Sequence, residues 1–292
     1  DQINLNANAT GAETYAYGAL DSIINTGAGN DGLHINANTN DNTNWDPAIG
    51  LSNTLVDLGA GSDSLHLNAN ANGAGVLEAY GATNTTINTD DLSSPGGDDY
   101  ISINASANSN WWDNPAEKST AIAFDKSILD TGAGNDQINL NANATGAETY
   151  AYGALDSIIN TGAGNDNLDI NAKASNSWIQ EAYGATNTTI NTDEFSSPGG
   201  DDYISISASA NNWWWDNYAE KSTAIAFDKS TLNTGDGNDQ INLNANAEGS
   251  GFLEAYGATN TTINTDDFFM SLIHISEPTR LRRMSDAVVW VE

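Results

Sequence analysis

Apolar and polar residues alternate strictly in short segments that recur along almost the whole chain. In each segment the second and fourth residues after an aspartate are isoleucine or leucine, and the sixth is alanine. Alternation with a period of two predicts a β-strand with one apolar and one solvated face. The aspartates that open these segments are Asp31, Asp63, Asp99, Asp136, Asp166, Asp202 and Asp239, and Asp1 begins the chain in the same register.

The spacing between these aspartates ranges from 30 residues, between Asp1 and Asp31, to 37 residues, between Asp99 and Asp136. Further short runs in each unit are rich in β-formers and bounded by Asn, Gly and Asp, which predicts a second and a third strand. The second strand is expected at 15–19 or 120–124, and the third at 22–26 or 85–89. We therefore expect an all-β fold, a parallel β-solenoid with one coil per 30–37-residue repeat that rises about 4.8 Å per coil.

The repeats also indicate how the coils contact one another. Residues 1–31 are identical to residues 136–166, but the second cassette omits the unit that spans 31–63. Loss of a whole unit is tolerated when each unit contacts only its neighbours, as in a solenoid. We expect a single array of about eight coils over 1–269 and an atypical tail over 270–292.

The two ends of the chain are interpreted separately from the array. Residues 271–280 resemble translated sequencing adapter, and the alternative is a genuine capping segment. The chain opens in the middle of a motif, so we expect the true N-terminus to lie elsewhere.

The fifth residue after each aspartate is almost always asparagine. In stacked coils these amides can hydrogen-bond to one another along the solenoid, although asparagine is also simply a soluble residue that this composition favours. The predicted ladder contains Asn6, Asn36, Asn68, Asn104, Asn141, Asn171, Ser207 and Asn244.

The composition limits the partners of the chain. The formal charge of −31, from 39 acids and 8 bases, disfavours binding to nucleic acid and to anionic lipid. No apolar run of about 18 residues is present, so we expect no membrane span. The absence of cysteine fits a secreted protein built without disulfides, although it fits many cytosolic proteins too. We expect an extracellular or cell-surface location.

The turn before each first strand has its own motif. Residues 27–31 read Gly-Ala-Gly-Asn-Asp and recur, lightly edited, at 59–63, 132–136, 162–166 and 235–239, while 95–99 and 198–202 begin with proline. This motif resembles the repeats-in-toxin (RTX) nonapeptide, which implies a calcium-binding parallel β-roll. The family has two motifs per coil and this chain one, so at most one edge would bind metal. We expect weak or empty sites at the proline variants.

The same chemistry follows from the residues. Glycines allow a sharp turn with carbonyl oxygens pointing outward, and calcium binds six to eight oxygens. A column of aspartates one coil apart would otherwise repel itself, although an ordinary turn needs no ion. The predicted metal-site residues are Gly27, Gly29, Asn30, Asp31, Gly59, Gly61, Asp63, Gly97, Asp98, Asp99, Gly132, Gly134, Asn135, Asp136, Gly162, Gly164, Asn165, Asp166, Gly200, Asp201, Asp202, Gly235, Gly237, Asn238 and Asp239.

Tryptophans cluster in the loop after the first strand. Neighbours in a strand point to opposite sides, so contiguous tryptophans cannot all face a narrow core. We consider packing between protomers, a glycan-stacking platform and a lid over the same coil. The residues are Trp111, Trp112, Trp213, Trp214 and Trp215.

Other features carry less weight. His34 and His66 occupy the same position in adjacent units, either as a transition-metal pair or as two isolated surface histidines. The recurring Thr-Asn-Thr-Thr-Ile-Asn-Thr suggests a water-ordering face, as in ice-binding proteins, but its copies are not on consecutive coils. No unique polar cluster indicates catalysis, so we expect no enzyme.

The function that these patterns favour is structural. Near-identical units suit length rather than chemistry, and open strand edges at both ends of the array would pair with another copy. We expect an extracellular, calcium-stabilised β-solenoid that self-assembles into a filament or surface fibre, or is a segment of one. The alternative is a secreted adhesin or glycan-binding stalk that uses the Trp-rich loops, and a solenoid polysaccharide lyase ranks third.

Overall fold

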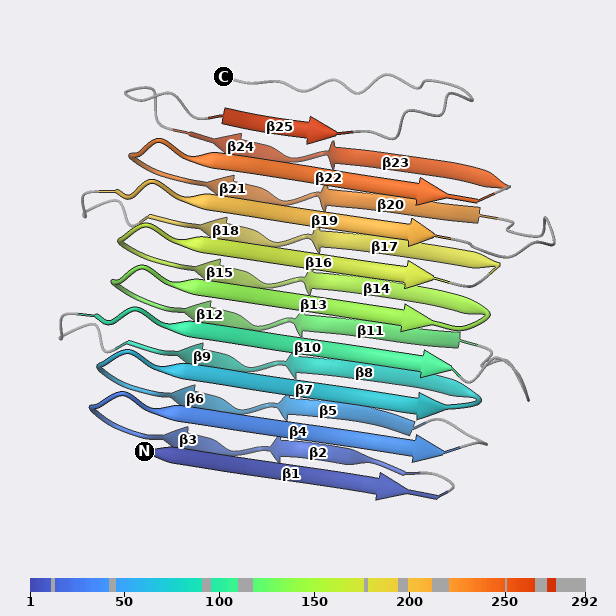
Figure 1. Cartoon of the computed structure of the whole chain (residues 1–292), viewed down its shortest axis with the longest axis horizontal. Helices are drawn as coiled ribbons and strands as arrows, with labels where there is room; N and C mark the ends of the chain where they lie inside the picture. Colours follow the sequence, from blue (N-terminus) through green and yellow to red (C-terminus); the bar gives the residue numbers. More distant parts are fainter. Residues whose placement is uncertain are drawn as a thin grey trace.

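The chain folds as an all-β parallel solenoid in which each repeat forms one coil of three strands (Figure 1). The computed structural model describes residues 1–11, 14–41, 46–90, 96–109, 118–175, 178–193, 199–211, 221–249, 251–265 and 272–276, and no helix occurs among them. Every strand pairs in parallel with its counterpart one coil away. Stacking of the coils produces three sheets that run the length of the described chain.

Sheet A is formed by the strands that follow the aspartates, joined at one end by a strand of the tail. Up to residue 248 their outward residues are mostly polar and their inward residues mostly aliphatic, as the alternation predicts. Sheet A contains β1 (Gln2–Thr10), β4 (Gly32–Asp41), β7 (Ser64–Gly73), β10 (Tyr100–Ser109), β13 (Gln137–Thr145), β16 (Asn167–Ser175), β19 (Tyr203–Asn211), β22 (Gln240–Glu248) and β25 (Leu272–Ser276).

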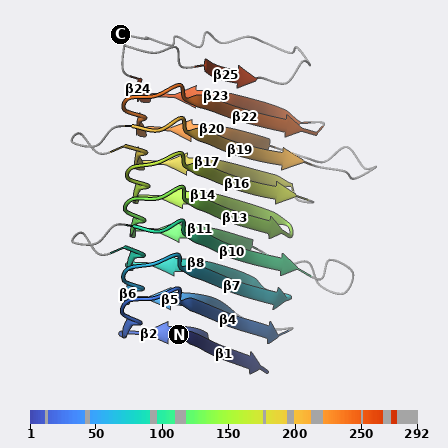
Figure 2. The same ribbon diagram turned by 60° about the vertical axis from the view of Figure 1, so that its left-hand side comes forward.

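Sheets B and C complete each coil and lie behind sheet A in Figure 1, while Figure 2 shows sheet C along the left edge of the stack. Sheet B contains β2 (Ala16–Leu20), β5 (Asp46–Ser52), β8 (Val76–Thr83), β11 (Lys118–Asp125), β14 (Glu148–Leu155), β17 (Ile179–Thr186), β20 (Lys221–Asp228) and β23 (Phe252–Thr259). Sheet C contains the three-residue strands β3 (Ile23–Asn25), β6 (Leu55–Asp57), β9 (Thr86–Asn88), β12 (Ile128–Asp130), β15 (Ile158–Asn160), β18 (Thr189–Asn191), β21 (Thr231–Asn233) and β24 (Thr262–Asn264).

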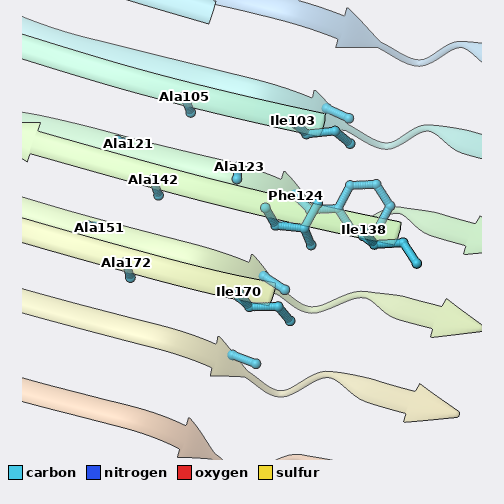
Figure 3. Packing of buried hydrophobic residues seen from close by; sticks show 14 of the residues in the cluster. Ile103, Ala105, Ala121, Ala123, Phe124, Ile138, Ala142, Ala151, Ile170 and Ala172 are labelled. Carbon is cyan, nitrogen blue, oxygen red and sulfur yellow. The ribbon is translucent and has the colours of Figure 1, made fainter. Parts of the chain in front are cut away.

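The core is a narrow column of small and aliphatic side chains between the sheets (Figure 3). Ile103 and Ala105 of sheet A are fully buried, as are Ala121 and Phe124 of sheet B. Burial of each large aliphatic side chain contributes roughly 1.5–3 kcal/mol. The sheets approach so closely that a Cβ placed on Gly153 would lie 2.3 Å from Cγ2 of Ile170. The abundance of alanine and glycine therefore reflects the width of the coil.

The corner between sheets B and C contains a left-handed residue in every coil. The residues have φ between 47° and 52° and are Asp21, Asn53, Asn84, Lys126, Asp156, Asn187, Lys229 and Asn260. Asparagine and aspartate tolerate this conformation better than other non-glycine residues. Asn53 also donates to Oδ1 of Asp21 across 2.6 Å, so this corner is cross-linked between coils.

The predicted asparagine ladder is confirmed on the outer face of sheet A. Asn141 donates to Oδ1 of Asn104 at 3.0 Å and accepts from Nδ2 of Asn171 at 3.2 Å. A second ladder, which the sequence did not reveal, joins Asn70 to Asn38 at 2.9 Å. Flat sheets of many strands usually need such side-chain ladders or stacking to suppress twist.

The tail contains one described strand, β25, which pairs with β22 in register from Gln240↔Leu272 to Asn244↔Ser276. Residues 277–292 lie outside the described part of the chain. Among the described residues, no helix has the length and apolarity needed to cross a bilayer.

Candidate functional site

The glycine-rich turns lie between sheet C and sheet A and stack directly on one another. Gly162 has a φ of +88°, and a Cβ placed on it would lie 1.6 Å from the carbonyl oxygen of Gly132 in the previous coil. That oxygen accepts the N–H of Ala163 at 2.9 Å. We expected outward-pointing carbonyls, but this one points along the solenoid axis, because the turns hydrogen-bond to each other. Glycine is thus required by conformation and by contact.

The aspartate that ends each turn is buried and linked to its counterpart. The N–H of Asp99 donates to Oδ1 of Asp136 at 2.8 Å, and the N–H of Asp136 donates to Oδ1 of Asp166 at 2.9 Å. The same bond joins Asp31 to Asp63 and Asp166 to Asp202. We call this row, from Asp31 to Asp239, the aspartate column; its members are at most 3% exposed. One carboxylate oxygen of each linked pair is thus already used by the backbone.

The second carboxylate oxygen divides the column into two kinds of turn. Oδ2 of Asp99 accepts a hydrogen bond from Thr89, and Oδ2 of Asp166 accepts one from Thr161. Oδ2 of Asp63, Asp136 and Asp202 is buried without a hydrogen-bond partner in the described structure. Unsatisfied buried oxygens of this kind call for a proton or a cation, because a desolvated charge is costly.

Burial raises the pKa values of five members of the column. It raises the pKa of Asp136 to about 7, against the opposing Thr131 hydroxyl and the N–H of Asp99. The nearby Asp166 and Asp90 carboxylates add to the rise. Burial also raises the pKa of Asp202 and of Asp99 to about 8. The pKa values of Asp63 and Asp166 rise to about 6 for the same reason. Near neutral pH the metal-free column is therefore partly protonated.

The two proline-containing turns gain a carboxylate where the others have glycine. Asp90 follows Thr89, as Gly132 follows Thr131, and its Oδ2 accepts the N–H of Ala133 at 3.1 Å. Asp193 holds the matching place beside Gly235, and burial raises its pKa to about 7. Pro95 and Pro198 themselves lie outside the described residues. These turns are thus the most carboxylate-rich part of the column.

The residue before each aspartate forms a separate, exposed ladder. The N–H of Asn165 donates to Oδ1 of Asn135 at 3.0 Å, and the N–H of Asp201 donates to Oδ1 of Asn165 at 2.7 Å. Oδ1 of Asn30, Asp98 and Asp201 also accepts a backbone N–H from the next turn. The side-chain oxygens of these predicted metal residues therefore bridge adjacent turns through backbone N–H groups.

The site fits a cation in part. The buried carboxylate oxygens without a hydrogen bond include Oδ2 of Asp63, Asp136 and Asp202, and hard oxygen donors of this type suit calcium. No group of three or more His, Cys, Asp or Glu side chains is arranged to hold a metal within the described residues. A cation here would therefore need backbone carbonyls and water beside the carboxylates.

Comparison with known proteins adds no relative. No protein-family model, curated protein or solved structure matches the chain. The geometry of the turns and of the sheets is therefore the basis for a functional proposal.

The remaining predicted sites have different outcomes. The five clustered tryptophans, Trp111, Trp112 and Trp213–Trp215, lie outside the described residues. His34 and His66 stack with ring centroids 4.7 Å apart on the outer face of sheet A, so they are neighbours rather than isolated groups.

The left-handed corner and the Asp90 and Asp193 carboxylates were missed. The corner could have been predicted from the Asn or Asp that recurs just before the third strand in most units, as at Asp21, Asn53 and Asn84. The added carboxylates could have been predicted from the aspartate that directly follows Thr89 and Thr192, where other units have glycine.

Proposed function

We propose that this chain is an extracellular structural protein, a cation-stabilised solenoid that forms a filament or surface fibre or is a segment of one. The observation that carries the proposal is the unbroken register of sheet A. Asn6, Asn36 and Asn68 lie opposite one another in successive strands, although their repeats differ in length. The extra residues of the longer repeats leave the stacking of the strands unchanged. What the repeats have in common is therefore a continuous stack along the solenoid axis and not the lining of a pocket.

The charge distribution supports a role for a cation. Carboxylates one coil apart share a buried column in a chain of net charge −31. Oδ2 of Asp63, Asp136 and Asp202 would hold the ion, while Oδ1 of each continues to accept the backbone N–H of the aspartate in the preceding coil. Calcium, when bound, supplies the positive charge that removes the desolvation cost. The resemblance of the turns to RTX repeats supports calcium over other divalent ions.

The test is electron microscopy of the purified chain in calcium and in chelator, with sedimentation of the same samples. Unbranched filaments are expected in calcium, and shorter or no filaments in chelator. A matched sample in magnesium separates calcium binding from general charge screening. Monodisperse single chains under all three conditions would contradict the proposal.

An adhesin or glycan-binding stalk is the second candidate. Trp178 lies between β16 and β17 and is 56% exposed, which suits an aromatic anchor for a ligand. Sugar binding that is lost in Trp178→Ala, by a chain that does not assemble, would favour this reading.

A further inference from the structure

The outer face of sheet A is almost uncharged in a chain of net charge −31. We define the amide face as the outward residues of sheet A, which are those at positions one, three, five, seven and nine of β1, β4, β7, β10, β13, β16, β19 and β22. Asparagine and serine dominate it, and in these described strands its only charged residues are Asp169, Lys173 and Glu248. Sheet B, by contrast, presents Glu78, Glu181 and other carboxylates outward.

From this face we infer a lateral interface with a second copy of the chain, and the inference rests on the proposed self-assembly. The face is long and flat (Figure 1), and its amide ladders hold side chains in place before any contact forms. Preordered amide rows are the surfaces that pack in dry sheet-to-sheet contacts. Another solenoid with the same axial repeat matches these rows coil by coil.

The area is sufficient for a stable pair. A strand of nine residues spans about 30 Å and eight strands about 38 Å, which gives about 1,100 Å² on each copy. Stable interfaces bury about 800 Å² per partner. Sheet C, with three residues per strand, offers only about 400 Å² on the same basis.

The two charges on β16 select one arrangement of the copies. Asp169 and Lys173 lie two residues either side of Asn171, about 13 Å apart along the strand, and neither has an ion pair in the described structure. A two-fold axis parallel to the solenoid and over Asn171 places Asp169 of each copy opposite Lys173 of the other. A two-fold axis along the strand would instead place like charges together. The solenoids therefore pair side by side with the same axial direction.

Charge reversal tests the arrangement. In calcium, Asp169→Lys and Lys173→Glu should each weaken self-association at least tenfold in sedimentation equilibrium, because each places like charges opposite. An equimolar mixture of the two variants should associate as tightly as the wild type, because each hetero-pair then has opposite charges. Asp57→Lys on sheet C and Lys126→Glu at the corner between sheets B and C make the same changes in charge elsewhere and should have no effect. Equal circular dichroism spectra show that all variants are folded.

The outcomes separate the inference from the proposed function. If wild-type filaments are single solenoids and both variants associate as the wild type does, the lateral interface is wrong. The proposed role in a fibre is unaffected by that result. A wild-type chain that stays monomeric overturns both. Monomers held by insoluble polysaccharide, with binding lost in both variants, show that a glycan occupies the face and also overturn the inference.

Discussion

The backbone N–H of Asp136 donates to Oδ1 of Asp166 across 2.9 Å, from one coil to the next. The residue that carries the buried charge of a coil therefore also links it to its neighbour. This double role has opposite energetic consequences. The hydrogen bond to a carboxylate is strong, while the desolvated charge is costly unless a proton or a cation neutralises it.

The first prediction concerns pH. Folding raises the pKa of Asp99 from 3.8 to about 8, so between these values the folded state holds a proton that the unfolded state has released. The free energy of unfolding of metal-free protein should therefore fall as pH rises from 4 to 8, and this stabilisation is fully present below the unfolded pKa. Urea midpoints in chelator at several pH values measure the effect. A midpoint that climbs from pH 5 to pH 8 would show that the column is not buried as described.

The second prediction separates the charge of Asp136 from its hydrogen bond. Asp136→Asn keeps an acceptor for the N–H of Asp99 and removes the charge, so it should raise stability in chelator at neutral pH. Asp136→Ala leaves that buried N–H unpaired and should cost about 1–3 kcal/mol. Chemical denaturation of both variants gives the comparison. Equal losses for the two substitutions would argue against the ladder.

The third prediction isolates the stacking of the turns. Gly162 and Gly27 have φ of +88° and +89°, but only Gly162 has a neighbouring carbonyl, that of Gly132, where a Cβ would lie. Both alanine substitutions carry the cost of a positive φ. Gly162→Ala should lose about 1–3 kcal/mol more, because the added methyl group overpacks the stack. Similar thermal shifts in the two variants would mean that the turns are not in contact.

The fourth prediction addresses the ladder on sheet A. Asn141→Ala removes one donated and one accepted amide hydrogen bond and should cost about 1 kcal/mol. Asn139→Ala is the control, since its Nδ2 has no hydrogen-bond partner among the described residues. Its effect should stay within about 0.5 kcal/mol. A larger loss for Asn139→Ala than for Asn141→Ala would contradict the assigned ladder.

The strands were predictable because one local signal repeats. Ile101 and Ile103 alternate with polar residues, and both are fully buried, as period two requires. The fifth-position asparagines also fell into register, because all strands start at the same distance from the aspartate. Expected bounds of 85–89 and observed bounds of 86–88 (Thr86–Asn88) differ only at the ends of the strand.

The turns were less predictable, because their geometry depends on contacts with the adjacent coil. The sequence alone does not reveal that the Gly132 carbonyl points along the axis, since this follows from the hydrogen bond of Ala163. Nor does it show that Asp90 replaces a glycine, because the inserted residues 91–95 shift the motif. Nor does the sequence show which carboxylates accept a hydrogen bond from a threonine, as Asp99 does from Thr89, because this also depends on how the turns stack.

The most direct test of the account is thermal unfolding, followed by circular dichroism, in calcium and in chelator at pH 7.5. The buried aspartate column predicts a higher midpoint and more strand signal in calcium than in chelator with sodium chloride of equal ionic strength. The calcium-dependent shift should shrink in Asp136→Asn, which removes one of the carboxylates with a free Oδ2. Identical midpoints and spectra under both conditions would contradict the claim that a cation neutralises the column.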